Sequence, residues 1–175
     1  MVPGSFTGYF TAAAAGAGVL IGLLFVAVSL RPESIVGHKA PPMAKAMSGS
    51  AFTALVNSFF VSLMALIPNS SLGAVAATLA LISLSNTGRL HLGRGKNAVA
   101  PLLMLSLAAF ATQLVAGIWL VFRPHEVSLV YTVAYLLIGS FGVALSRAWA
   151  LMQGERTAAP AESPAAPVPE HATAS

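Results

Sequence analysis

The sequence predicts an all-α polytopic membrane protein, built as a bundle of five transmembrane helices. Of its 175 residues 57% are hydrophobic and only 8% are charged, whereas about a quarter of the residues of soluble domains are charged. The apolar residues form five long runs, separated by short segments that carry proline, glycine or basic residues. Because a bilayer offers no water to peptide groups, each run must close its hydrogen bonds within a helix.

The first run, residues 9–30, contains no charged side chain. As a helix it extends about 33 Å, which is enough to cross the hydrocarbon core. Arg31-Pro32-Glu33 follows it, and proline disfavours helix at the residue before it. A secretory signal peptide is the competing interpretation. No basic segment precedes the run and the run is longer than a signal core, so the pattern favours a retained helix.

The second and third runs, residues 47–67 and 72–88, flank the polar turn Pro68-Asn69-Ser70-Ser71. A single helix over both runs would be about 63 Å long, twice the hydrocarbon thickness. We therefore expect a helical hairpin. The third run is the weakest of the five, with Asn86 and Thr87 at its end, and a re-entrant or interfacial segment is the alternative for it.

The fourth and fifth runs are residues 98–122 and 127–152. Pro101 falls in the first turn of the fourth helix, where the missing amide hydrogen costs little. After the fifth run the composition changes to Ala, Pro, Ser and Glu, with too little apolar bulk to offset the entropy of ordering. The sequence thus predicts one membrane domain over residues 1–153 and a disordered cytoplasmic tail over residues 154–175.

Basic residues predict the orientation. With five spans, segments 31–45 and 89–97 and the carboxyl end all lie on one face, opposite Arg123. The eight basic residues on that face are Arg31, Lys39, Lys45, Arg89, Arg94, Lys96, Arg147 and Arg156. The positive-inside rule makes that face cytoplasmic and places the amino terminus outside. Removing the third span would put the two basic loops on opposite faces, so five spans is the self-consistent count.

Small residues recur at four-residue or three-residue spacing in two of the runs. Gly18 and Gly22 lie in the first run, and Gly139 and Gly142 lie with Ser146 in the fifth. Small side chains let helix backbones approach closely in membranes. We expect these glycines to pack the first helix against the fifth within the bundle; the alternative is an interface between copies of the chain.

Asn57 and Gln113 are the most polar side chains deep in the predicted spans. An amide in hydrocarbon costs several kcal/mol unless it finds a partner, so both should face protein or water. From the run boundaries, Gln113 is expected about 7 Å nearer the outer surface, so a direct pairing is one option among several. Two roles are open for these amides. They can form interhelical hydrogen bonds that hold the bundle together, or they can line a polar permeation path or contact a ligand.

Ionisable side chains are missing from the middle of every run. The chain has no cysteine and no aspartate, and its histidines lie in loops or the tail. Arg147 is close enough to an end of its run for its side chain to reach the interface. Proton relays, carboxylate-bound metals and bis-histidine haem therefore lack their usual ligands. We predict no catalytic, cofactor-binding or metal residues, and hence a non-enzymatic protein.

The basic residues do not indicate nucleic-acid binding, because they lie between apolar runs as a topology signal. The loop around Gly88 to Lys96 lacks the Walker spacing, and we expect it to touch anionic lipid headgroups. An enzyme acting at the membrane surface through Glu33, His38 or His91 is the least supported alternative.

Two segments carry a resemblance. Ala15-Gly16-Ala17-Gly18-Val19-Leu20-Ile21-Gly22 with its apolar continuation, and Leu66-Ile67-Pro68, resemble small uncharacterised bacterial multi-pass membrane proteins over about the first ninety residues. The resemblance implies a bacterial cytoplasmic membrane and no established activity. From the residues we expect an accessory or regulatory component that packs against the lipid bilayer and against another membrane protein or a second copy. The rival is a channel or facilitator lined near Asn57 and Gln113.

Overall fold

The computed structural model describes residues 2–30, 32, 37, 40–92 and 100–158, with only the backbone described at 42–44, 90–92, 100–103 and 150–158. These residues form a short 3-10 helix, η1, and five α-helices, without any strand in the described part of the chain. The elements are η1 (Gly4–Phe6), α1 (Thr7–Leu30), α3 (Pro42–Leu66), α4 (Leu72–Leu92), α5 (Ala100–Phe122) and α6 (Val127–Ala158). The predicted all-α class is confirmed.

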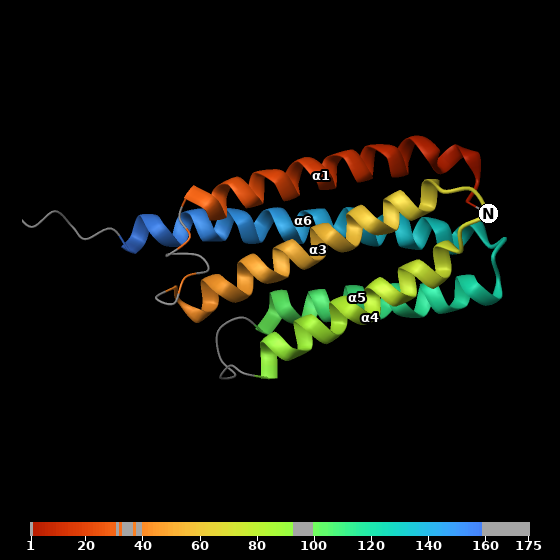
Figure 1. Ribbon diagram of the computed structural model, residues 1–175. Helices are drawn as coiled ribbons and strands as arrows, with labels where there is room; N and C mark the ends of the chain where they lie inside the picture. The colour runs from red at the N-terminus through yellow and green to blue at the C-terminus, as the bar shows by residue number, and fades with distance from the viewer. Residues whose placement is uncertain (1, 31, 33–36, 38–39, 93–99, 159–175) are drawn as a thin grey trace, which may run out of the picture.

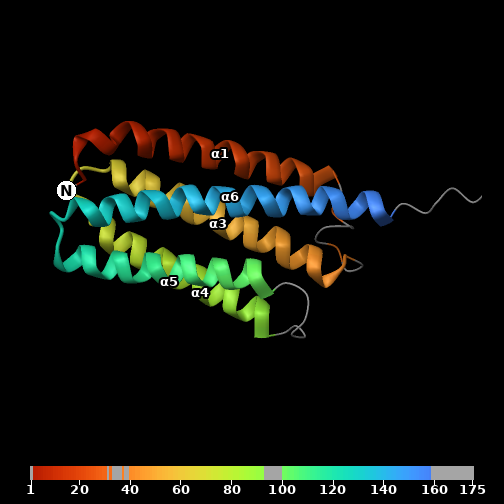
Figure 2. The same cartoon turned by 180° about the vertical axis from the view of Figure 1, so that it is seen from behind.

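Successive helices alternate in direction along one bundle axis (Figure 1). We call the end that holds the chain start and the turns at 67–71 and 123–126 the amino-terminal end, and the opposite end the carboxyl-terminal end. Helix α3 is central and contacts α1, α4 and α6, whereas α5 packs against α4 and α6. Figure 2, seen from behind, shows α6 running between α1 and α5.

Four helices are long and apolar enough to cross a membrane, as expected of a multi-pass membrane protein. Within the described residues these segments are Gly4–Leu30, Lys45–Leu66, Met104–Phe122 and Val127–Trp149. Helix α4 does not reach the same apolarity, in line with its polar last turns. The apolar window of α1 is 17% buried and that of α3 is 50% buried, so α1 covers one side of the bundle and α3 forms its centre.

Several helices are longer than their apolar runs. Helix α3 begins at Pro42, α4 continues to Leu92, and α6 continues to Ala158. Proline suits the first turn of a helix, and Gln153, Glu155 and Arg156 are good helix formers. The first residues of the predicted tail are therefore helical, and residues 159–175 lie outside the described part of the chain.

The turn between α3 and α4 is fixed by its own side chains. Asn69 has a φ of 62°, a left-handed conformation that asparagine tolerates. The Ser70 hydroxyl donates to the Met64 carbonyl at 2.5 Å, and the Ser71 hydroxyl accepts the Ala74 N–H at 3.3 Å. The turn thus caps both helices and brings them together as the predicted hairpin.

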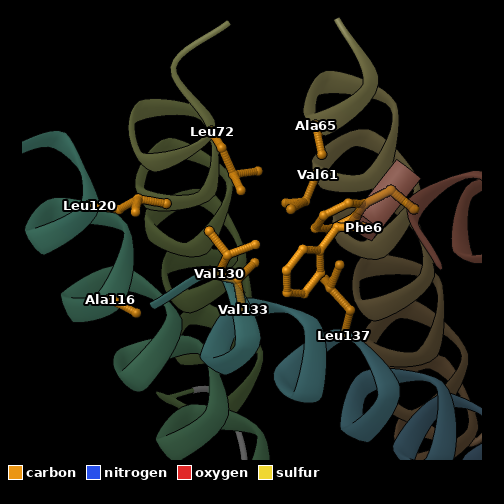
Figure 3. Packing of buried hydrophobic residues seen from close by; sticks show 10 residues of the cluster. Phe6, Val61, Ala65, Leu72, Ala116, Leu120, Val130, Val133 and Leu137 are labelled. Carbon is orange, nitrogen blue, oxygen red and sulfur yellow. The ribbon is translucent and has the colours of Figure 1, made fainter. Parts of the chain in front are cut away.

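The core differs between the two halves of the bundle. The amino-terminal half holds a large apolar cluster, whose side chains meet between the helices in Figure 3. It comprises Phe6, Phe10, Val61, Ala65, Leu72, Ala116, Leu120, Val130, Val133 and Leu137. A smaller cluster of Ala51, Ala54, Leu55, Phe110 and Ala144 lies toward the carboxyl-terminal half, together with buried polar side chains.

Candidate functional site

Asn57 and Gln113 contact each other directly in the middle of the bundle. Asn57 Nδ2 donates to Gln113 Oε1 at 2.9 Å, and Gln113 Nε2 donates back to Asn57 Oδ1 at 3.1 Å. Gln113 Nε2 also donates to the Ala76 carbonyl at 3.2 Å. Each side chain is only 1% exposed. This amide pair therefore connects α3, α5 and α4 through one buried group of hydrogen bonds.

The expected 7 Å offset between the two amides is wrong. Helix α3 begins at Pro42, five residues before the apolar run, and α5 begins at Ala100, two residues after the predicted start. Both helices run in the same direction, so these shifts bring Asn57 and Gln113 to nearly equal distances from their helix starts. The apolar runs therefore do not mark where these two helices begin.

The amide pair is suited to holding helices together. Both N–H groups and the oxygen of the Gln113 amide are bonded, and Asn57 contributes one donor and its acceptor. Toward the amino-terminal end α3 continues with two buried hydroxyls, that of Ser58, which donates to the Ala54 carbonyl, and that of Ser62, which has no hydrogen-bond partner among the described residues, and the apolar cluster lies beside them. A polar path through the described residues would have to break the amide pair and then cross that cluster.

Arg147 lies inside the bundle, so the expected extension of its side chain to the interface is wrong. Its guanidinium Nη2 donates to the Ser106 hydroxyl of α5 at 2.5 Å, and Arg147 and Ser106 are both buried. Both residues take part in further interactions. A buried arginine within an apolar helix is costly unless its guanidinium is bonded, and here it is bonded to Ser106.

The glycines expected to pack the first helix against the fifth do not do so. Gly18 faces Phe59 of α3, whose ring lies 3.5 Å from the point that a Cβ atom on Gly18 would occupy. Nothing lies within 4 Å of the corresponding point at Gly22, Gly139 or Gly142. The buried face of α1 is instead formed by Phe10, Ala13, Ala14 and Ala17. The predicted intramolecular packing through Gly22, Gly139 and Gly142 is therefore wrong for the described chain.

Helix α1 is joined to α6 through aromatic side chains near the amino-terminal end. The Tyr9 hydroxyl donates to the Ala134 carbonyl at 2.7 Å. The rings of Phe6 and Tyr131 meet edge to face, with centroids 4.7 Å apart. These contacts hold η1 and the start of α1 beside α6 without the predicted glycines.

The closest backbone approach involves two glycines outside the predicted packing stripes. A Cβ on Gly117 would lie 2.6 Å from the Ala77 nitrogen, and one on Gly73 would lie 2.7 Å from the Gly117 carbonyl oxygen. Helices α4 and α5 thus touch through their backbones. Gly117 lies one turn after Gln113, so this contact also brings Gln113 within reach of Ala76. Small residues at four-residue spacing, Gly73 and Ala77, were the available signal.

The structure does not describe the side chains of the residues on which the membrane-surface enzyme alternative depends. Glu33 and His38 lie outside the described residues, as do Arg31, Lys39, Arg94 and Lys96, and only the backbone of His91 is described. Among the described residues, no three His, Asp or Glu side chains are grouped to hold a metal ion. No known family model, curated protein or solved structure matches the chain.

Proposed function

We propose that the protein is a non-enzymatic accessory component of a membrane complex, which binds a membrane helix of another protein or of a second copy through the outward face of α6. One observation carries this proposal. A row of exposed residues, which we call the α6 seam, follows the helix at alternating four- and three-residue spacing. It consists of Tyr131, Tyr135, Ile138, Gly142, Leu145 and Trp149.

This spacing is the one with which paired helices keep a common seam. Gly139 and Ser146 flank the α6 seam and are exposed too, so a partner backbone can approach closely around Gly142. Lipid chains place no demand for small side chains on a helix surface, whereas a partner helix does. The tyrosine and tryptophan side chains supply large contact areas at its two ends.

The interior supports the same role over the rival channel or facilitator. In the rival, Asn57 and Gln113 line a polar path, but their amides bond each other and the Ala76 carbonyl. A solute passing between the amides would have to replace these hydrogen bonds, and it would offer only transient contacts in return. With these amides bonded to each other, the outer faces of the helices are the surfaces left for binding a partner.

The proposal includes a bacterial cytoplasmic membrane, with the amino terminus outside and the carboxyl terminus in the cytoplasm. The membrane rests on the resemblance of the first ninety residues, and the orientation on the basic loops. It also includes α4 as a fifth span. Its length of 21 residues suffices, and Ser83 and Thr87 are buried within the bundle and so avoid lipid.

Cysteine crosslinking in membranes tests the α6 seam, because the chain has no cysteine of its own. Single variants Ile138→Cys, Gly142→Cys and Leu145→Cys should crosslink to one defined partner, or to a second copy, and adding Gly142→Leu to Ile138→Cys should remove the product. Gly16→Cys on α1 is the matched control, since nothing lies within 4 Å of its Cβ position either. Equal crosslinking at Gly16 and the α6 seam would contradict the proposal.

Flux through proteoliposomes tests the rival. We expect the wild-type protein to give no ion or small-solute flux above that of empty liposomes. Flux that disappears in Asn57→Leu or Gln113→Leu, with the folded protein still present, would favour a channel or facilitator and would overturn the accessory role.

A further inference from the structure

The α6 seam carries no charge. Among the α6 residues whose side chains the structure describes, Arg147 alone is charged, and it is buried and bonded to Ser106 of α5. Two copies of a charged face repel each other, whereas two copies of an uncharged face do not. Charge therefore makes the α6 seam compatible with a second copy of itself.

A second copy also presents the seam in the required direction. The basic residues of one sequence give every copy the same orientation in the membrane, so α6 of a second copy runs parallel to the first and at the same depth. Alternating four- and three-residue spacing keeps two parallel helices in contact along one line. In a symmetric pair each seam residue then lies beside the same residue of the second copy.

Small residues in the middle of the α6 seam allow close approach in such a pair. Gly142 is exposed, and nothing lies within 4 Å of the point that a Cβ atom on it would occupy. Gly139 and Ser146, one turn to either side, are exposed as well. Because both copies bring these residues to the same depth, the two backbones can approach without a side chain between them.

The amino-terminal end of the α6 seam is ordered before any partner binds. The rings of Tyr131 and Tyr135 are stacked with their centroids 6.4 Å apart, and Tyr131 also meets Phe6 edge to face. Side chains that are already held in place lose less conformational entropy on binding. The two tyrosines therefore form a ready contact surface.

The exposed area is close to what a dimer needs. Tyr131, Tyr135 and Trp149 are 50%, 68% and 59% exposed, which leaves about 350 Å² of aromatic surface on each copy. Ile138 and Leu145 add to this area, since each is more than half exposed. A stable interface buries about 800 Å² on each partner. Helices α1 and α5, which lie on either side of α6 in Figure 2, supply neighbouring surface.

We propose that two copies of the chain associate through their α6 seams as a parallel, symmetric dimer. This inference rests on the proposed function and names the partner as a second copy. Gly142 is the point of closest approach, the stacked tyrosines meet their counterparts at the amino-terminal end, and Trp149 meets its counterpart at the other. The interior of each bundle, including the amide pair, is the same in the dimer.

Disulfide crosslinking in liposomes that contain only this protein tests the dimer. Single variants Ile138→Cys and Leu145→Cys should each give a product of twice the chain mass with a mild oxidant, at every protein-to-lipid ratio down to high dilution. Val115→Cys on α5 is the matched control, because Val115 is 58% exposed and Leu145 is 61% exposed. Equal product from Val115→Cys and the seam variants would mean random collision and would overturn the dimer.

Mixing the two seam variants, each with a tag of different size, tests the register. Positions 138 and 145 lie about 10 Å apart along a helix, so a parallel dimer should give same-residue products and almost no mixed product. Mixed products in equal yield would overturn the parallel, symmetric arrangement.

The result in native membranes separates this inference from the proposed function. No product in liposomes, together with a product to a different protein in native membranes, would overturn the second copy as partner and leave the accessory role standing. No product in either membrane would overturn both.

A substitution at the point of closest approach tests the contact itself. Gly142→Leu, combined with Leu145→Cys, should weaken association about tenfold or more, because a large side chain keeps the backbones apart. The open space around its Cβ position lets the single chain accept this change. Gly16→Leu on α1, where nothing lies within 4 Å either, is the control. Unchanged crosslinking in the Gly142→Leu protein would overturn the α6 seam as the dimer interface.

Discussion

The two buried carboxamides obey a simple rule for polar groups in an apolar interior: each has found a partner. Asn57 and Gln113 bond each other twice, and Gln113 also bonds the Ala76 carbonyl. The pair is neutral, so burial costs only the lost hydration of the amides, which these bonds offset. The pair affects the free energy of unfolding mainly when one amide is removed, because the other is then buried without its hydrogen bonds.

A double-mutant cycle measures this coupling. Asn57→Leu and Gln113→Leu should each lower the free energy of unfolding by about 1–3 kcal/mol, because the remaining amide is buried without its partner. The double variant should lose less than the sum, with a coupling energy of about 0.5–2 kcal/mol. Reversible unfolding in mixed detergent provides the measurement, with Thr112→Val as the control. Strictly additive losses would show that the pair does not form.

The sequence predicts that both amides need partners but not that they are partners of each other. A helix start misplaced by five residues moves a side chain about 7 Å along the axis, and α3 starts at Pro42, five residues before its apolar run. Arg147 illustrates the same difficulty. Its position near the end of an apolar run suggests a surface side chain, whereas the rotation of α6 turns it inward.

At the level of elements, α4 depends most on its neighbours. Among the described helices longer than one turn, it alone lacks a segment apolar enough to cross a membrane by composition, and it packs between α3 and α5. Its buried face carries Gly73 at one end and Ser83 and Thr87 toward the other. The backbone contact with α5 at Gly117 fixes the distance between the two helices. Packing against α3 and α5 thus stabilises α4, whose own apolar side chains stabilise it only weakly.

Substituting the contact glycine tests this arrangement. Gly117→Ala should destabilise the protein by about 1–3 kcal/mol, because the new methyl group would meet the α4 backbone and force the helices apart. Gly16→Ala, where nothing lies within 4 Å of the Cβ position, should be neutral or slightly stabilising through helix propensity. Thermal unfolding compares the two variants. A Gly117→Ala protein as stable as wild type would exclude a direct backbone contact.

The sequence predicts where the helices are, but it does not predict which face of each helix points into the bundle. In a soluble protein the apolar stripe of a helix marks its buried face. In a membrane the lipid is as apolar as a protein core, so the spacing of Gly22 in α1 or of Gly139 in α6 does not reveal which way either residue points. This is why the glycine spacing in α1 and α6 predicts an internal contact, whereas the actual glycine contact lies between α4 and α5.

For the molecule as a whole, the chain's polarity is distributed unevenly between its two ends. The amino-terminal half contains the large apolar cluster, and the carboxyl-terminal half contains the buried contact between Ser106 and Arg147. The turns at 67–71 and 123–126 lie together at the amino-terminal end (Figure 1). If the basic end is cytoplasmic, both turns must face the opposite side of the membrane.

Impermeant thiol labelling in intact cells checks this topology. Because the wild-type chain has no cysteine, single variants report single positions. Asn69→Cys and His125→Cys should react without permeabilisation, and Lys39→Cys should react only after it. Labelling of Lys39→Cys from outside would reverse the orientation. Labelling of Asn69→Cys and His125→Cys from different sides would mean that α4 and α5 do not both cross.

The all-α class, the approximate helices and the need of Asn57 and Gln113 for polar partners are all contained in the amino-acid sequence. Each follows from local chemistry, since an apolar run in a bilayer must be helical and a buried amide must be bonded. Which faces meet is visible only in the folded chain: the amide pair, the α4–α5 glycine contact and the inward turn of Arg147. These contacts depend on the rotation and axial shift of whole helices, which uniformly apolar sequences leave unmarked.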